Sequence, residues 1–261
     1  MHGSRRAVLT GLIGVAGCGG RPVERQAATV ASAPGAGATV SASEPQAMVA
    51  GAGFALVELF SSEGCSSCPP ADALLDEVRA SARPNVLTLA FHVDYWDSLG
   101  WPDPYASASF TARQEDYVRG LGLRQLYTPQ MIVNGRREFV GSDRSRAKAA
   151  IDDALAQPAS VQLTLGAPRV IAGQREVSVS LTEAPSDAVL FVAAVAGPLV
   201  SEVKRGENAG RTLHHGSVVR SLARGAARPD SVLTVPGSAG RLVAWVQRPG
   251  GPVLGATSLS G

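Results

Sequence analysis

Apolar and polar positions in the middle of the chain follow two spacings, one typical of strands and one typical of helices. Short apolar runs indicate buried strands, whereas apolar residues three and four positions apart indicate amphipathic helices. Asn134-Gly135 indicates a tight hairpin turn, because these residues readily adopt positive φ angles. Ser142 or Asp143 is the expected cap of the helix that follows. In chain order the pattern predicts a strand at 54–60, a helix at 69–83, a strand at 86–93, a helix at 106–120, a hairpin at 131–140 and a helix at 143–157.

The pattern changes after residue 159, where glycine and proline punctuate a series of short apolar runs. Alternation of strands with helices predicts a mixed sheet covered by helices over residues 51–158. Evenly spaced short strands predict an antiparallel β-sandwich-like region over residues 159–261, which carries no recognisable catalytic motif. Its strand-like runs are 161–165, 176–181, 189–196, 231–235 and 242–247.

The first 50 residues are typical of an export signal and a linker. Residues 1–18 combine basic residues with an apolar run too short to span a bilayer, which indicates a signal peptide. Arg5 and Arg6 resemble a twin-arginine motif, and residues 15–18 resemble a lipobox that ends at Cys18. We therefore expect export by the Tat or Sec route and a lipid-anchored protein of the periplasm or cell envelope, acylated at Cys18. The alternative is an ordinary Sec signal with an incidental cysteine. Residues 19–50 are rich in Ala, Gly, Ser and Pro and are expected to form a flexible linker.

Composition and charge exclude several classes of protein. The 261-residue chain is 45% hydrophobic, which allows a packed core, and its formal net charge is only +2. Basic residues are spread along the chain, so no nucleic-acid-binding face is expected. With three cysteines in a chain of this length, a small scaffold held together by disulfides is excluded.

Cys65-Ser66-Ser67-Cys68 is the motif that indicates redox chemistry. It follows the first predicted strand and leads into the first predicted helix, where unpaired N–H groups and the helix dipole favour a thiolate. Cys65, on the loop side, is the expected exposed nucleophile, and Cys68 is the expected buried resolving thiol. Pro69 and Pro70 weaken the dipole argument, because the regular helix then begins after the pair.

Two other interpretations of the cysteine pair remain open. It is half of a zinc site if His92, His214 or His215 completes the ligand set, although no second cysteine pair exists. It is a static disulfide if the protein resides in an oxidising compartment. No metal and no cofactor are expected.

Several other residues are expected to lie near the cysteines. The order of elements makes Pro129 a candidate cis-proline, with the backbone of Thr128 offered to a bound chain. Glu58, in an apolar strand, is a candidate base for the resolving thiol. At the end of the second strand, His92 is a candidate proton carrier, and Asp94 and Trp96 are candidate substrate contacts, because ligands gather beyond the carboxyl ends of parallel strands.

These motifs together resemble an exported bacterial thioredoxin-like family known as domain of unknown function 1223. The resemblance covers most of residues 54–261 and implies a thioredoxin-like fold and a β-rich C-terminal part, but no established substrate. The wider thioredoxin superfamily implies the nucleophile role of Cys65 and the cis-proline role of Pro129. The segments that carry the resemblance are 57–60, 65–72, 92–97, 128–130, 133–135 and 206–215.

The sequence therefore predicts an α/β thioredoxin-like domain followed by an antiparallel β-sandwich-like region. The expected function is thiol-disulfide exchange through Cys65 and Cys68 with thiols or disulfides of envelope proteins. Two alternatives remain: Cu(I) handling through the two cysteines and His92, and a non-catalytic envelope binding module with a static disulfide.

Overall fold

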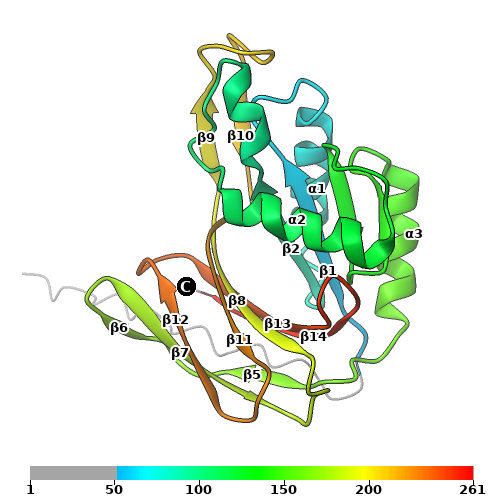
Figure 1. Cartoon of the computed structure of the whole chain (residues 1–261), viewed down its shortest axis with the longest axis vertical. Helices are drawn as coiled ribbons and strands as arrows, with labels where there is room; N and C mark the ends of the chain where they lie inside the picture. Colours follow the sequence, from blue (N-terminus) through cyan, green and yellow to red (C-terminus); the bar gives the residue numbers. More distant parts are fainter. Residues whose placement is uncertain (1–51, 261) are drawn as a thin grey trace, which may run out of the picture. The chain divides into compact units, whose positions relative to one another are not determined.

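The computed structural model describes residues 52–260, and the elements in this part follow the predicted order closely up to residue 158 (Figure 1). The predictions for the signal peptide at 1–18, the linker at 19–50 and the lipid on Cys18 fall outside the described residues. In residues 52–260, no helix combines the length and the hydropathy that a membrane span requires. The helices are α1 (Pro69–Ala80), α2 (Ala108–Leu121), α3 (Arg144–Leu155) and the 3₁₀ helix η1 (Asp94–Leu99).

Fourteen strands occur in the described residues. The first four belong to the predicted α/β region: β1 (Ala55–Ser61), β2 (Val86–His92), β3 (Gln130–Val133) and β4 (Arg137–Val140). The other ten are β5 (Leu163–Leu165), β6 (Arg169–Ile171), β7 (Gln174–Leu181), β8 (Val189–Ala196), β9 (Leu199–Glu202), β10 (Thr212–His215), β11 (Val218–Ala226), β12 (Ser231–Pro236), β13 (Arg241–Gln247) and β14 (Val253–Leu259).

Local signals in the sequence correctly placed several turns and caps. Asn134 and Gly135 have φ angles of 50° and 60° and connect β3 to β4. The carboxylate of Asp143 accepts a hydrogen bond from the backbone N–H of Arg146 at 3.0 Å and caps α3. Each of these features depends on residues close together in the chain, and this is why sequence alone predicts them.

The predicted fold class is wrong, because strands from the two predicted regions form one mixed sheet of eight strands in the order β14-β13-β8-β11-β2-β1-β3-β4. The two halves meet where β11 pairs in parallel with β2, at Val218 and Ala90. The backbone N–H of Ala90 donates to the carbonyl of Ser217 at 2.7 Å, and the hydroxyls of Thr88 and Ser217 lie 2.7 Å apart. The molecule is therefore neither a thioredoxin-like α/β domain nor such a domain with a separate β-sandwich after it.

The eight-stranded sheet is covered on both faces. On one face, α2 packs over a core that includes Phe60, Phe91 and Phe110 (Figure 1). The same core extends to Trp245 on the C-terminal strand β13. On the opposite face, α1 and α3 cover β1, where the alternate residues Ala55, Val57 and Leu59 point. The alternation of side chains along β1 thus separates two cores.

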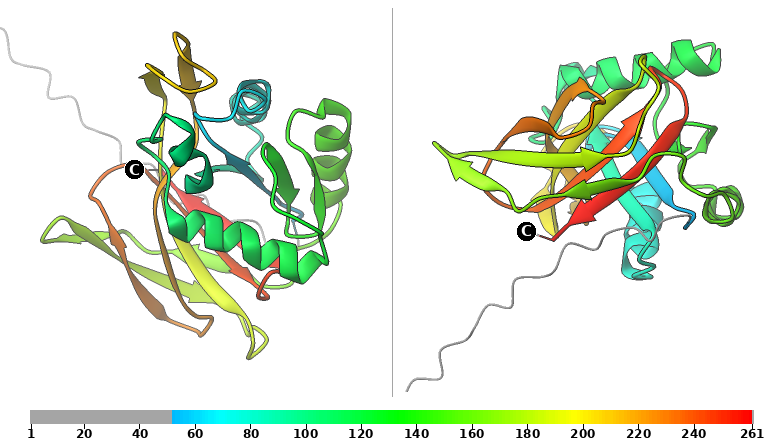
Figure 2. Two further views of the ribbon diagram at one scale, coloured as in Figure 1. Left: turned by 45° about the horizontal axis from the view of Figure 1, so that its top comes forward. Right: turned by 90° about the horizontal axis from the view of Figure 1, so that it is seen from below.

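A smaller sheet, β12-β7-β5 with β6 paired to β7, packs against the C-terminal half of the large sheet (Figure 2). The core between them contains alternate residues of β8, Leu190, Val192 and Ala194, whereas Ala193 and Val195 face the α2 side. The β9–β10 hairpin, which forms a separate two-stranded sheet, lies beside α1. This hairpin brings a distant part of the chain to the cysteine pair.

Candidate functional site

The cysteine pair lies in the turn between β1 and α1. Cys68 is the N-cap residue of α1 and has helical backbone angles, and Pro69 and Pro70 occupy the first two helical positions. The backbone N–H of Cys68 donates to the carbonyl of Cys65 at 3.2 Å. A disulfide joins the two cysteines, whose Cα atoms lie 5.4 Å apart. Because the prolines have no N–H group, this helix start offers fewer free donors to a sulfur atom than an ordinary one.

Both cysteines are fully buried, with a relative exposure of 0% each. The predicted exposure of Cys65 is therefore wrong for this disulfide-bonded form, whereas the predicted burial of Cys68 is confirmed. Ser66 and Ser67 carry the exposed surface of the turn, and the Ser67 hydroxyl lies 3.3 Å from Cys65 Sγ.

The segment between β9 and β10, residues 203–211, covers this turn, and we call it the covering loop. The buried side chain of Asn208 donates from Nδ2 to the carbonyls of Glu63 and Cys65, at 2.8 and 2.9 Å. The Glu207 carboxylate accepts a hydrogen bond from the Ser66 backbone N–H at 3.0 Å. The covering loop is thus attached to the redox motif on both sides of Cys65.

Asp72 lies one helical turn after Cys68. Residues four apart on a helix share a face, and side chains lean toward the N-terminus, so the Asp72 carboxyl lies on the Cys68 side of α1. Burial raises the pKa of Asp72 to about 6, although nearby His92 and His215 and a hydrogen bond from Ser61 oppose the shift. The fold thus places an acid with a pKa of about 6 one helical turn from Cys68, a position for which the sequence had suggested Glu58.

Two buried histidines occupy the space behind this turn. His92, at the end of β2, donates from Nδ1 to Asp103 Oδ2 at 2.7 Å. His215, at the end of β10, donates from Nε2 to Glu63 Oε1 at 3.1 Å. The imidazole rings meet edge to face with centroids 4.9 Å apart. We call the group formed by these two histidines, their carboxylate partners and Asp72 the buried histidine cluster. Its members are Glu63, Asp72, His92, Asp103 and His215.

Charge pairing, rather than exposure to water, sets the protonation of this cluster. Burial alone lowers the pKa of His92, but the charge and hydrogen bond of Asp103 outweigh it and raise that pKa. Burial alone raises the pKa of Asp103, but the pairing with His92 lowers it overall. For Glu63, hydrogen bonds from His215, Ser201 and Trp101 outweigh the effect of burial and lower its pKa.

Two buried ring nitrogens near the cysteines have no hydrogen-bond partner in the described structure. They are His92 Nε2 and His215 Nδ1. Buried polar groups are normally satisfied, so unpartnered groups indicate a functional role or an ordered water molecule. Here they give the cluster free positions for accepting or passing on a proton.

Trp96 connects the cysteine turn to the predicted cis-proline. A Cβ atom added to Gly64 would lie 3.1 Å from Trp96 Cβ, so the tryptophan packs against the residue before Cys65. Trp96 Nε1 donates to Thr128 Oγ1 at 2.8 Å. The Thr128–Pro129 peptide bond is cis, which confirms the prediction.

Pro129 also lies near the start of α1. A Cβ atom added to Gly141 would meet both Ala71 Cβ and Pro129 Cβ, at 3.0 and 3.2 Å, which places the proline beside the first turn of that helix. Asp94, in contrast, is engaged in local structure: it accepts a hydrogen bond from Thr111 Oγ1 at 2.6 Å, and its own N–H donates to that oxygen.

Glu58 lies elsewhere. It is fully buried on the α2 face of the sheet, where Arg113 Nε donates to it at 2.7 Å and the Tyr117 hydroxyl donates to its second oxygen. The partners of Glu58 are thus Arg113 and Tyr117, and Cys68 lies at the start of α1 on the opposite face. The geometry does not bring Glu58 together with the cysteines.

Within residues 52–260, no group of three or more His, Cys, Asp or Glu side chains is arranged to hold a metal ion. Of the histidines considered as zinc ligands, His92 and His215 each donate to a carboxylate, and His214 is exposed. The zinc and copper interpretations therefore gain no support from this geometry.

Four members of the buried histidine cluster were absent from the predicted site. Asp72 and Glu63 lie within seven residues of a cysteine, so proximity to the motif was a usable signal. Asp103 and His215 reach the site only through a loop and a hairpin. The hydrogen bond between Asp103 and His92 joins residues 11 positions apart, and the one between His215 and Glu63 joins residues 152 positions apart.

Comparison with known proteins supports the resemblance at the level of the family, but not the thioredoxin-like fold that it implied. The crystal structure of protein AGR_C_4864 from Agrobacterium tumefaciens, a structural-genomics target, is similar with a TM-score of 0.61 and 29% sequence identity. The similarity covers 82% of this chain and 96% of that chain. Comparison with curated proteins gives no match. The family model described as "Protein of unknown function (DUF1223)" matches residues 56–242, and the chain therefore belongs to the DUF1223 family.

Proposed function

We propose that the protein carries out thiol-disulfide exchange through Cys65 and Cys68. The observation that carries the proposal is the position of Asp72, a buried acid with a pKa of about 6, one helical turn behind a disulfide-bonded pair. Thiol-disulfide exchange requires proton transfer to and from sulfur near neutral pH, and a group with a pKa in this range is suited to that task.

The disulfide-bonded form accepts two electrons from a partner dithiol. A partner thiolate attacks one sulfur, which breaks the Cys65–Cys68 bond, forms a mixed disulfide with Cys65 and releases Cys68 as a thiolate. The second thiolate of the partner protein then attacks the partner's sulfur in the mixed disulfide and releases Cys65. The partner ends as a disulfide and the protein as a dithiol, and the reverse sequence reduces a partner disulfide. The reduction potential relative to the partner sets the direction.

Asp72 is the proposed proton carrier for Cys68. When Cys68 leaves as a thiolate, protonated Asp72 supplies a proton, and ionised Asp72 takes it back when Cys68 becomes the attacking group. His92 and His215 act on Asp72 through their charge, since both lower its pKa. The cluster therefore tunes the proton carrier rather than contacting a partner chain.

A partner has to reach sulfur atoms that are buried in the disulfide-bonded form. A cleft of about 530 Å³ runs between α1 and β10, and its lining includes Pro69, Asp72 and His214. Displacement of the covering loop opens the turn from the other side, since Asn208 and Glu207 bond to it there. We infer that exchange requires the covering loop to move.

The reduction potential is the decisive measurement. The full chain with Cys18→Ser, which leaves two thiols, is equilibrated in dithiothreitol redox buffers, and the oxidised fraction is read by thiol alkylation and mass spectrometry. An exchanging pair is expected above roughly −300 mV, and a structural disulfide below it.

Two variants in the same Cys18→Ser background test the roles of single residues. Cys68→Ser is expected to accumulate mixed disulfides at Cys65, and Asp72→Asn is expected to slow exchange most at pH values near 6. A reduction potential below roughly −300 mV, together with the absence of mixed disulfides at Cys65, would contradict the proposal.

A second candidate function is a non-catalytic binding protein with a static disulfide. The complete burial of both cysteines favours it, because structural disulfides are commonly shielded from reductants. In that case the potential is low, and Asp72→Asn leaves the rate of reduction unchanged.

For the place of action, we propose the cell envelope. The proposal rests on the basic start, the apolar run and the lipobox-like segment that ends at Cys18. Envelope proteins that carry thiols or disulfides are the corresponding partners. Mass spectrometry of protein from membranes is expected to find a lipid-bearing N-terminal Cys18, and a soluble mature chain that begins well after residue 18 would contradict the anchor.

A further inference from the structure

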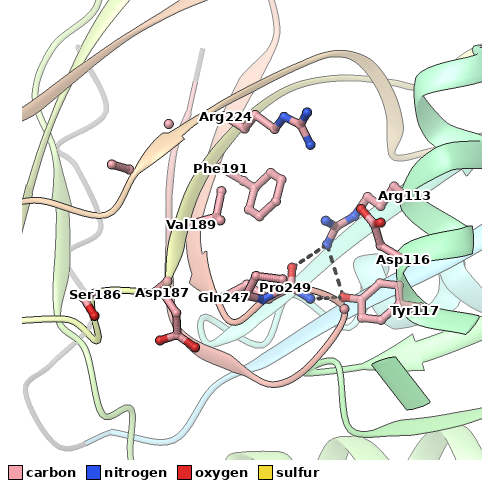
Figure 3. Close-up of a pocket in the computed structure, with 14 residues that line it drawn as sticks. Arg113, Asp116, Tyr117, Ser186, Asp187, Val189, Phe191, Arg224, Gln247 and Pro249 are labelled. Atoms are coloured by element: carbon pink, nitrogen blue, oxygen red, sulfur yellow. Dashed lines mark hydrogen bonds between the residues drawn. The ribbon is translucent and has the colours of Figure 1, made fainter. Parts of the chain in front are cut away.

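A second cavity lies on the opposite face of the large sheet from α1, beneath α2 (Figure 3). It has a volume of about 620 Å³, within the usual range for small-molecule sites. Its walls come from α2, the start of β8, the end of β11 and the turn after β13. Nothing in the proposed redox chemistry uses this cavity.

Arg113 is held at one side of the cavity by a fixed set of partners. Its Nε donates to Glu58 at 2.7 Å. Its Nη2 donates to Gln247 at 2.9 Å and to Tyr117 at 3.2 Å (Figure 3). In residues 52–260, the third nitrogen, Nη1, has no such partner. The guanidinium carbon lies 4.9 Å from the centre of the Phe191 ring, which fixes the orientation of the group further.

Arg224 lies beside the same ring. It pairs directly with Phe191 across β11 and β8, so the two side chains point to the same face of the sheet. Phe191 in turn stacks on Trp245 with ring centroids 5.2 Å apart. Arg224 is exposed and forms no ion pair with any residue of the described chain. Figure 3 shows the Arg113 and Arg224 guanidinium groups on the same side of the Phe191 ring.

The acidic residues of the cavity do not neutralise Arg224. Asp116 pairs with Arg119 at 2.6 Å, and Asp187 pairs with Arg248 at 3.6 Å. Glu58 is matched by Arg113. The charges around the cavity therefore balance except for Arg224, which leaves one positive charge beside an aromatic ring and apolar side chains.

We propose that this cavity is a binding site for a monocarboxylate with an apolar body. The carboxylate lies between Arg224 and Arg113 Nη1, where both guanidinium groups donate to it. The apolar part lies against Phe191 and the apolar lining formed by Ala188, Val189 and Pro249. This site is independent of the proposed redox function, because it lies across the sheet from α1 and contains no cysteine.

Octanoate tests the proposal, with octan-1-ol as a probe of the same chain length but no charge. Isothermal titration of the full chain is expected to show saturable binding of octanoate at least tenfold tighter than binding of octanol. Arg224→Gln is expected to weaken octanoate binding by about tenfold or more, the usual scale for loss of a charge-assisted contact, and Arg224→Glu to abolish it. Binding of octanol should stay unchanged in both variants. Arg228→Gln, an exposed arginine outside the cavity, is the matched control.

Three results would overturn the proposal. They are absence of octanoate binding at millimolar concentration, equal affinity for octanoate and octanol, and an Arg224→Gln variant that binds octanoate like the unmodified chain. Thermal unfolding of each variant separates loss of binding from loss of fold. Arg224 is exposed, so its replacement is expected to leave the melting temperature nearly unchanged.

Discussion

Asp72 is a carboxyl group that the fold retains at a cost to its own stability. Its ordinary pKa of 3.8 is raised to about 6, chiefly by burial, so the folded chain binds this proton more tightly than the unfolded chain does. Stability from this group is therefore full at low pH, falls as pH rises from about 4 to about 6, and stays reduced above that range. A structural role alone would be met better by an uncharged side chain.

Asp72→Asn is accordingly expected to stabilise the protein at pH 7 and to have little effect at pH 4. A shift of two pKa units corresponds to about 2–3 kcal/mol in the free energy of unfolding. Urea unfolding at the two pH values measures the difference. Asp230→Asn, at an exposed position with a positive φ angle that asparagine tolerates, is the control. A variant less stable than the unmodified chain at pH 7 would contradict this account.

The pairing of His92 with Asp103 gives a second expectation for a single residue. Asp103 raises the pKa of His92 against the effect of burial, so in Asp103→Asn the pKa of His92 should fall. Removing one partner of a buried ion pair is also expected to cost about 3–5 kcal/mol of stability. Titration of the histidine ring signals by NMR checks the pKa, with the exposed ring of His214 as an internal reference. A rise in the pKa of His92 would show that Asp103 does not control it.

At the scale of residues, the sequence predicts the bonding and backbone geometry of a functional residue where its motif is contiguous. Cys65 and Cys68 are bonded to each other, as their spacing allows, and the bond before Pro129 is cis. Glu58 shows the limit, because its apolar neighbours indicate burial but not which face of the strand it occupies or that Arg113 is its partner. That partner lies 55 residues away in the sequence.

At the scale of elements, the β9–β10 hairpin controls access to the disulfide. Asn208 holds the covering loop against the turn with two hydrogen bonds and is itself fully buried. Asn208→Ala leaves the carbonyls of Glu63 and Cys65 without this donor, so we expect a loss of about 1–3 kcal/mol in stability. We also expect faster reduction of the disulfide by dithiothreitol, measured under native conditions by thiol alkylation. Lys204→Ala, on the same hairpin and paired with exposed Glu202, should leave the reduction rate unchanged. Equal rates in both variants would mean that the covering loop does not shield the sulfur atoms.

The elements that sequence predicted poorly are those whose side chains do not alternate clearly. β11 contains Arg220, Arg224 and Gly225 and reads as a polar segment, yet it joins the two halves of the large sheet. Its pairing partners on either side, β8 and β2, supply the stabilisation that its own composition lacks. The apolar pattern within each single segment therefore predicted β8 and β13 but not β11, which connects them to β2.

At the scale of the whole molecule, one core is shared by the two regions that the sequence had separated. Phe60, Phe91 and Phe110 lie in the same cluster as Val243 and Trp245. The buried Arg113–Glu58 pair also depends on the C-terminal part of the chain, because Gln247 accepts from Arg113 and donates to the Tyr117 hydroxyl.

A fragment that ends at residue 158 is therefore expected not to fold by itself. It would lose Trp245 and the rest of the C-terminal side of this core, and it would expose the edge of β2 that pairs with β11. It would also leave the Arg113–Glu58 pair without Gln247 and open to water. Fragment 51–158 should accordingly give narrow amide dispersion in NMR spectra and no cooperative thermal transition, whereas fragment 51–261 should unfold in a single transition by circular dichroism and by tryptophan fluorescence. A dispersed spectrum and a cooperative transition for 51–158 would show that the N-terminal region is an independent domain, and that the shared sheet is a contact between two folded units rather than a common core.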